Sequence, residues 1–352
     1  MSEYYDYDEA VRANEARRRK AARLRRKRKA RIRLIKRNIL RGIVLVVLTL
    51  LVVQFAKHII PDIQSRRELK QNAVSADTGT YDDVITVVQE KPVFQYALKS
   101  VNYKEMADTD IQSPYVALLD VTNEFIAGRQ INTRIYPASM TKVMSLIVAV
   151  ENIDDMNKTY KFGFDELNNL YVQQASVAGF SVDEEVAAND LLYGLILPSG
   201  ADAAGAIAKI TAGTEEAFVE LMNKKCEELG LKNTHFCNPS GLHDENQYTT
   251  PAEMALIMKY AMSNELCAKV LGTYQYTTAA TPQHPQGIQL TSTMFSRMYG
   301  NAGKTGYTDQ AHNCLVNYAE KDGKEYITVM AAAGNRWYVI FDGFKIFERY
   351  LP

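Results

Sequence analysis

The 352-residue chain has few cysteines and histidines, and neither residue type forms a recognisable metal motif. Its four cysteines include no Cys-x-x-Cys pair, and its five histidines include no His-Glu-x-x-His motif. Because zinc sites usually show such spacings, the sequence predicts no metal site. A disulfide between Cys226 and Cys237 is one possibility in an oxidising exterior, but free buried thiols are the interpretation that we favour.

The chain also lacks net charge, although its two parts are charged oppositely. Residues 1–41 hold 16 Lys/Arg against 5 Asp/Glu, a net charge of +11, so the remaining residues sum to −11. No aromatic residue follows Tyr7 in this basic tail, and no nucleic-acid-binding motif comes after it. We therefore expect no nucleic-acid partner, since anionic lipid at the cytoplasmic leaflet can account for the basic residues.

A long apolar run follows the basic tail. The stretch "ILRGIVLVVLTLLVVQFAKHII" covers residues 39–60, and at ~1.5 Å per helical residue it reaches about 33 Å, enough to cross a bilayer. Basic residues before the run and an acidic domain after it place the N-terminus in the cytoplasm. The sequence thus predicts a basic cytoplasmic tail over 1–38, a single uncleaved transmembrane signal-anchor helix over 39–60, and an extracytoplasmic globular domain at the cell membrane.

The remainder divides into a polar stalk or linker over 61–113 and a globular domain over 114–352. Strand-like runs flank a turn at 120–123, and a second pair surrounds the turn "EKDGK" at 320–324. Between these pairs the patterns are mostly helical, so the sequence predicts an α+β fold with one antiparallel sheet. Helices are expected over 139–152, 184–197, 214–230, 250–264 and 336–351. The fourth of them begins with a predicted capping box of Thr250 and Glu253.

The first chemical motif is Ser139-x-x-Lys142, within "PASMTK". Residues three apart lie on one face of a helix, so the lysine amine can reach the serine hydroxyl. A desolvated lysine has its neutral form favoured and can take the proton of a serine nucleophile. The pattern alone is weak, because about one match is expected by chance in a chain of this length.

Two further motifs complete the set. Lys304-Thr305-Gly306 offers a cation, a hydroxyl and a residue without a Cβ atom, which suits a strand edge that binds an anionic substrate. Ser199, in "LPSGADAAG", lies between two expected helices. By itself Ser199 is best interpreted as a helix N-cap, with Asp202 favourable in the first turn.

In this order the three motifs form the active-site set of penicillin-recognising serine acyl-enzymes. The segments "LLDVTNEFIAGRQINTRIYPASMTKVMS", "LLYGLILPSGADAAGAIA", "ELGLKNTHFCNPSGLHDENQYTTPAEMALI" and "GKTGYTDQAHNCL" resemble serine-type D-alanyl-D-alanine carboxypeptidases, the low-molecular-weight penicillin-binding proteins. The resemblance runs from about residue 114 to the C-terminus. It implies a β-lactamase/transpeptidase-like fold, with an antiparallel sheet flanked by helices and an inserted helical subdomain.

The resemblance also implies a mechanism. Ser139 would attack the carbonyl between two D-alanines, with Lys142 as general base and Ser199 as proton relay. Lys304 and Thr305 would hold the terminal carboxylate against Gly306, and the backbone N–H groups of Ser139 and Tyr307 would form the oxyanion hole. The expected partners are the peptidoglycan pentapeptide ending in D-Ala-D-Ala and β-lactam antibiotics, with no metal or organic cofactor.

The sequence departs from the family pattern at three points. Ala201 occupies a position where the family usually has Asn, and His312 one where glycine is common. The chain ends at "FERYLP", so we expect residues 39–60 to replace the C-terminal membrane helix of many relatives. Two alternatives stay open: a catalytically weakened peptidoglycan-binding homologue, which Ala201 favours, and a class A-like serine β-lactamase, for which no convincing deacylating carboxylate is found.

Overall fold

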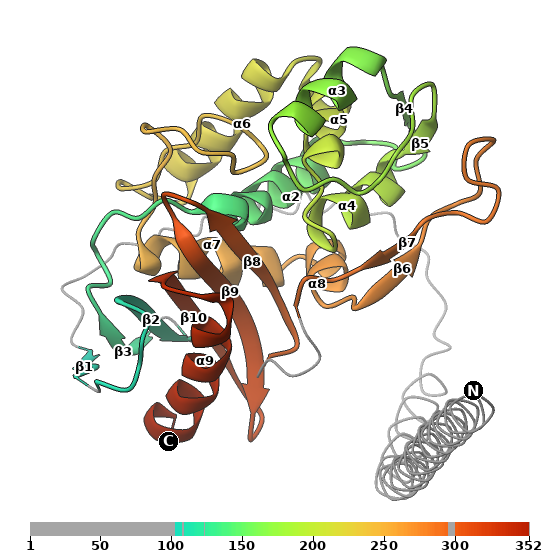
Figure 1. The fold of residues 1–352 in the computed structure, drawn as a ribbon. Helices are drawn as coiled ribbons and strands as arrows, with labels where there is room; N and C mark the ends of the chain where they lie inside the picture. Colours follow the sequence, from blue (N-terminus) through green and yellow to red (C-terminus); the bar gives the residue numbers. More distant parts are fainter. Residues whose placement is uncertain (1–102, 108, 123, 295–299, 352) are drawn as a thin grey trace, which may run out of the picture. The chain divides into compact units, whose positions relative to one another are not determined.

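The computed structural model describes residues 103–107, 109–122, 124–294 and 300–351 (Figure 1). The predicted cytoplasmic tail, the predicted membrane span and the stalk up to residue 102 lie outside these ranges. Within the ranges, no helix combines the length and the apolar character that crossing a bilayer requires.

A six-stranded sheet forms the centre of the domain, in the order β1-β3-β2-β10-β9-β8. The hairpins expected around 120–123 and 320–324 are present, as β2–β3 and β9–β10. The sheet is not wholly antiparallel as predicted, because β1 pairs with β3 in parallel. The strands are β1 (Lys104–Glu105), β2 (Tyr115–Asp120), β3 (Glu124–Arg129), β8 (Ala302–Thr308), β9 (His312–Lys321) and β10 (Lys324–Ala333).

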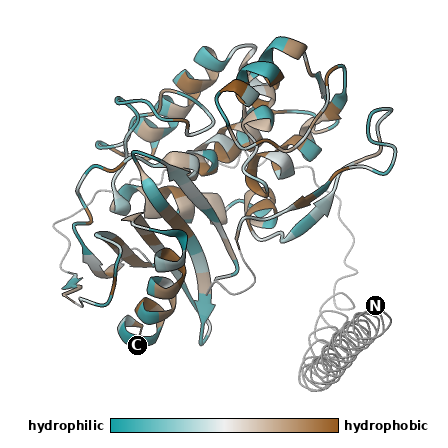
Figure 2. Cartoon of the chain, viewed as in Figure 1, coloured by the Kyte–Doolittle hydropathy of each residue, from teal (hydrophilic) through white to brown (hydrophobic). Residues whose placement is uncertain are grey.

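Helices cover both faces of the sheet (Figure 1). The last helix, α9 (Arg336–Tyr350), packs on one face, and α2 (Thr141–Asn152) and α7 (Pro251–Met262) belong to the core on the other. Consecutive residues of a strand point to opposite faces, so Leu118 joins the α9 side of the core and Leu119 the α2 and α7 side. Figure 2 shows hydrophobic and hydrophilic residues alternating along α9, the pattern of an amphipathic helix.

The helical subdomain is inserted between the terminal strands, as expected. The helix predicted over 184–197 is shorter than expected, because residues 185–187 form a strand, β5, that pairs with β4, and the helix α4 begins only at Ala188. The elements are β4 (Thr159–Lys161), α3 (Phe164–Val172), β5 (Glu185–Ala187), α4 (Ala188–Ile196), α5 (Ala201–Ala212), α6 (Glu215–Glu228), α8 (Glu265–Leu271), β6 (Gln275–Thr277) and β7 (Gln289–Thr291).

The predicted capping box of α7 is only half correct. Thr250 caps the helix, since its side chain accepts a hydrogen bond from the Glu253 backbone N–H. The Glu253 carboxylate instead turns to the loop before it, where it accepts from the backbone N–H groups of Lys232 and Asn233 and from the Thr234 hydroxyl. Three hydrogen bonds to a carboxylate in a buried loop stabilise the fold by more than the single hydrogen bond that a complete capping box would add.

The domain begins earlier than residue 114, so residues 103–113 do not belong to a stalk. Met106 and Ile111 are buried in the core beneath α9. The buried carboxylate of Asp342, on α9, accepts hydrogen bonds from the Gln112 N–H, the Ser113 N–H and the Ser113 hydroxyl. The segment is mostly polar, so its sequence does not predict that Met106 and Ile111 belong to the core; their packing beneath α9 is set by the tertiary structure.

Candidate active site

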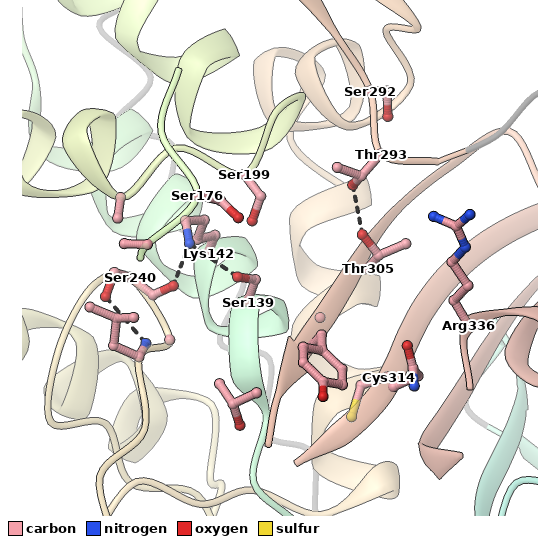
Figure 3. Close-up of a pocket in the computed structure, with 18 of the residues that line it drawn as sticks. Ser139, Lys142, Ser176, Ser199, Ser240, Ser292, Thr293, Thr305, Cys314 and Arg336 are labelled. Carbon is pink, nitrogen blue, oxygen red and sulfur yellow. Dashed lines mark hydrogen bonds between the residues drawn. The ribbon is translucent and has the colours of Figure 1, made fainter. Parts of the chain in front are cut away.

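Ser139 and Lys142 lie together where a short 3₁₀ turn, Ala138–Met140, leads into α2. The Lys142 amine is 3.2 Å from the Ser139 hydroxyl and also donates to the Ser240 carbonyl (Figure 3). Lys142 is 2% exposed, and this burial lowers the pKa of its amine to about 7, against the opposing effect of the Asp202 carboxylate. Near neutral pH a large fraction of the amine is therefore uncharged and able to accept a proton.

Two glycines allow other segments to approach the backbone of Ser139 closely. A Cβ atom at Gly306 would lie 3.0 Å from the Ser139 nitrogen, and one at Gly241 would lie 2.1 Å from the Ala138 oxygen. Gly241 also has a φ of +80°, which other residues rarely adopt. Gly306 lies on β8, the edge strand of the sheet, as predicted. Substitution of either glycine would push the Ser139 turn away from its neighbours.

The predicted Lys-Thr-Gly residues differ in whether they line the cavity. Thr305, Gly306 and Tyr307 line the cavity in front of Ser139, whereas the Lys304 amine donates to the Thr305 carbonyl and is not part of the lining. Burial, together with the charge of Lys142, holds the pKa of Lys304 well below its usual range. The Thr305 hydroxyl donates to the Thr293 hydroxyl, 2.6 Å away. Lys304 is therefore a buried residue beneath the cavity lining, near enough to Lys142 for the two amines to affect each other.

Ser199 is not the cap of α5. Gly200 occupies the N-cap position, and no side chain caps the helix there. Ser199 instead has a φ of +66°, is buried, and lines the cavity with a hydroxyl that has no hydrogen-bond partner among the described residues. A buried hydroxyl without a partner is costly, and its strained backbone points to a functional constraint.

Ala201 and Asp202, at the start of α5, hold the wall of the cavity opposite β8. The Ala201 N–H donates to the Ser176 carbonyl at 2.7 Å. The Asp202 carboxylate accepts hydrogen bonds from the N–H groups of Ala178 and Gly179. Sequence reasoning placed Asp202 only in a helix turn, because nothing in the sequence shows which backbone N–H groups surround it.

Arg336 is a cavity residue that the sequence analysis missed. It precedes the rest of α9 and lines the cavity beyond Thr305 (Figure 3). A guanidinium stays charged at all relevant pH values and recognises carboxylates in a planar, two-pronged fashion. Since burial disfavours the charge of Lys304, Arg336 is the side chain best suited to provide a positive charge in the 540 Å³ cavity.

The remaining candidates contribute no chemistry of their own. All four cysteines are free, so the disulfide between Cys226 and Cys237 is not formed. Cys314 lines the cavity, but burial raises the pKa of its thiol to about 12. His312 has a φ of +53°, which explains the preference for glycine at that position. Across the described ranges, no His, Cys, Asp and Glu side chains cluster as metal ligands do.

Comparison with known proteins identifies the family of the chain. Residues 102–335 match the Peptidase S11 family, described as D-alanyl-D-alanine carboxypeptidase. The chain is 34% identical over 217 residues to the D-alanyl-D-alanine carboxypeptidase DacF of Bacillus subtilis, a match that covers 60% of this chain and 55% of that protein. It is 33% identical over 232 residues to the D-alanyl-D-alanine carboxypeptidase of Streptomyces sp. K15, covering 61% of this chain and 79% of that one.

Solved structures show the same fold. The Streptomyces K15 DD-transpeptidase superimposes with a TM-score of 0.64 at 28% identity, over 68% of this chain and 96% of that one. A D-alanyl-D-alanine carboxypeptidase from Mycobacterium tuberculosis gives a TM-score of 0.62 at 25% identity, over 70% and 95%. The expected transpeptidase/β-lactamase-like fold is thus confirmed. The chain belongs to the Peptidase S11 family, the D-alanyl-D-alanine carboxypeptidases.

Proposed function

We propose that the chain is a serine D-alanyl-D-alanine carboxypeptidase that removes the terminal D-alanine from peptidoglycan stem peptides and is acylated by penicillins. The observation that carries the proposal is the 3.2 Å contact between the Ser139 hydroxyl and a buried Lys142 amine whose pKa is about 7. A serine beside a base that is neutral at working pH can attack a carbonyl.

The reaction would proceed in two steps. Lys142 takes the Ser139 proton as the oxygen bonds to the carbonyl carbon of the penultimate D-alanine, and the backbone N–H groups of Ser139 and Tyr307 receive the oxyanion. The C–N bond then breaks, Ser199 passes a proton to the amine of the leaving D-alanine, and the acyl group stays on Ser139. A water molecule hydrolyses the ester and restores the serine.

We assign the substrate carboxylate to Thr305 and Arg336, and give Lys304 a supporting role. Thr305 and Arg336 both line the cavity on the same side of Ser139 (Figure 3). The Lys304 amine bonds to the Thr305 carbonyl, so it would orient the strand and shape the local potential. Gly306 would keep this strand close enough to Ser139 for the carboxylate and the scissile carbonyl to bind together.

Acylation of Ser139 tests this proposal directly. A fluorescent penicillin should label the protein covalently, the label should map to the Ser139 peptide by mass spectrometry, and the protein should release D-alanine from a pentapeptide. Labelling that persists undiminished in Ser139→Ala would contradict the assignment. Labelling without release of D-alanine would instead favour the weakened peptidoglycan-binding homologue, which Ala201 supports.

A β-lactamase activity is less well supported. Class A enzymes use a carboxylate to activate the deacylating water. Of the described residues that line the cavity, none is Asp or Glu. We therefore expect the penicilloyl-enzyme to persist, so that labelled protein remains visible long after free penicillin is removed.

We also propose that residues 39–60 anchor the enzyme in the cell membrane, with residues 1–38 in the cytoplasm and the catalytic domain outside. The length of the apolar run and the charge asymmetry around it support this topology. Externally added protease should release the catalytic domain from spheroplasts and leave the basic tail protected. Recovery of the full-length chain in the soluble fraction would contradict the anchor.

A further inference from the structure

A second hollow lies at the C-terminal end of α3, beside the proposed catalytic cavity. Its volume is about 680 Å³, and its lining is mostly apolar. Three of its apolar side chains are exposed to solvent: Tyr171 by 83%, Val172 by 72% and Val177 by 43%. Because clustered exposed apolar side chains often mark binding surfaces, this hollow is a candidate ligand site.

The hollow is continuous with the catalytic cavity. Gln174 and Ala175 line both of them, and Ser176 lines the cavity next to Ser199 (Figure 3). A ligand bound at Ser139 can therefore extend past Ser176 into the hollow while staying in contact with the protein.

The wall between the two spaces is held in place by hydrogen bonds. The Ser176 carbonyl accepts from the Ala201 N–H at 2.7 Å, and the Ala175 N–H donates to the Leu170 carbonyl at 3.0 Å. The Asp202 carboxylate binds the N–H groups of Ala178 and Gly179. A surface that is ordered before binding loses less conformational entropy when a ligand binds than a flexible loop does.

The position of the hollow indicates which part of a substrate could reach it. Thr305 and Arg336 lie on one side of Ser139, and Ser176 lies on the other (Figure 3). With the terminal carboxylate at Thr305 and Arg336, the peptide before the scissile bond must leave toward the opposite wall. The Asp202 carboxylate is occupied by backbone N–H groups, so the hollow presents mainly apolar surface to the substrate.

We propose that this hollow is a subsite for the acyl-donor peptide, the residues that precede the two D-alanines, which it binds through their aliphatic parts. The proposal rests on the carboxypeptidase function proposed above. It makes Tyr171 and Val172 determinants of substrate length: they add transition-state binding for the longer acyl-donor part of a pentapeptide, of which a short acylated tripeptide keeps only one residue.

The test compares two substrates that end in D-Ala-D-Ala, a stem pentapeptide and a diacetylated tripeptide. The readout is the ratio of their kcat/KM values in the full chain and in Tyr171→Ser, Val172→Ser and the double variant. We expect the ratio to fall about tenfold in the double variant, as for the loss of roughly one aromatic contact. Phe164→Ser is the matched control, since Phe164 is 63% exposed on the same helix but does not line the hollow.

The outcomes separate the two proposals. A ratio that is unchanged in the double variant, with D-alanine still released, overturns the subsite and leaves the carboxypeptidase function intact. Equal ratios in Phe164→Ser and the double variant, both lowered, overturn it as well, because the effect would then belong to the helix as a whole. Failure of the unmodified chain to release D-alanine from either peptide overturns the function, and the subsite with it.

Discussion

The Lys142 amine lies 3.2 Å from the Ser139 hydroxyl, in a site where burial lowers the pKa of the amine to about 7. The contact forms because a 3₁₀ turn places Ser139 one turn before Lys142 on the axis of α2. The low pKa arises because Lys142 is buried, and the opposing effect of the Asp202 carboxylate, which raises the pKa, is smaller. Helix geometry thus supplies the distance, and packing supplies the basicity.

The first prediction concerns pH. Only the neutral amine can take the serine proton, so the rate constant for acylation by penicillin should increase as pH rises through about 7 and then level off. Stopped-flow measurement of acylation between pH 5.5 and 9 checks this, with circular dichroism as a control for folding. A rate that is flat across this range would mean that Lys142 is not the base.

The second prediction concerns Ala201, which lines the cavity and is 5% exposed. Ala201→Asn adds an amide where relatives usually carry one. One added hydrogen bond to the substrate contributes ~0.5–1.5 kcal/mol, so kcat/KM for D-alanine release should rise by about 2- to 13-fold.

The control for that experiment is Ser176→Ala, alone and combined with Ala201→Asn. If Ala201→Asn leaves the rate unchanged in the otherwise native chain but raises it in the Ser176→Ala background, the Ser176 hydroxyl already provides the missing contact. No change in either background would show that this side-chain position does not limit the reaction.

The third prediction concerns Arg336. In Arg336→Gln the cavity loses its guanidinium, so KM for a peptide with a free C-terminal carboxylate should rise at least tenfold, as for loss of a charge-assisted hydrogen bond. The matched substrate is the same peptide with a C-terminal amide, whose KM should change much less. Equal losses for both peptides would show that Arg336 acts on the fold and not on the carboxylate.

The fourth prediction concerns stability. Asp342→Ala leaves the Gln112 N–H, the Ser113 N–H and the Ser113 hydroxyl without their buried acceptor. The free energy of unfolding should fall by roughly 3 kcal/mol, and Tm by roughly 6–12 °C. Glu348→Ala, an exposed change on the same helix, is the control. Thermal unfolding that is equal in both variants would contradict the role of Asp342.

Much of the architecture was readable from local patterns. The hairpins at 120–123 and 320–324, the helix after Ser139 and the amphipathic C-terminal helix follow from periodicity and turn residues, which act over a few neighbouring positions. The family pattern also pointed to Ser139, Lys142, Ser199 and the Lys-Thr-Gly segment as one site, and the fold brings these residues together.

Other features depend on contacts between distant segments and were missed or misjudged. Residues 103–113 looked like a stalk, yet Asp342, more than two hundred positions later, binds them. Glu253 looked like half of a capping box, yet it binds the loop at 232–234. In both cases a local rule identified the residue type correctly, but a buried carboxylate bonds to whichever donors the fold brings near.

The sequence by itself determined the order of the main elements, which follows from local patterns, and its motifs and family resemblance pointed to Ser139 as candidate nucleophile, Lys142 as candidate base and the Lys-Thr-Gly strand beside them. Only the tertiary structure decided that Lys304 is buried and bonded to its own strand, that Arg336 lines the cavity from α9, and that an apolar hollow continues the cavity past Ser176. Burial and the meeting of distant segments set those features, and neither can be read from neighbouring residues.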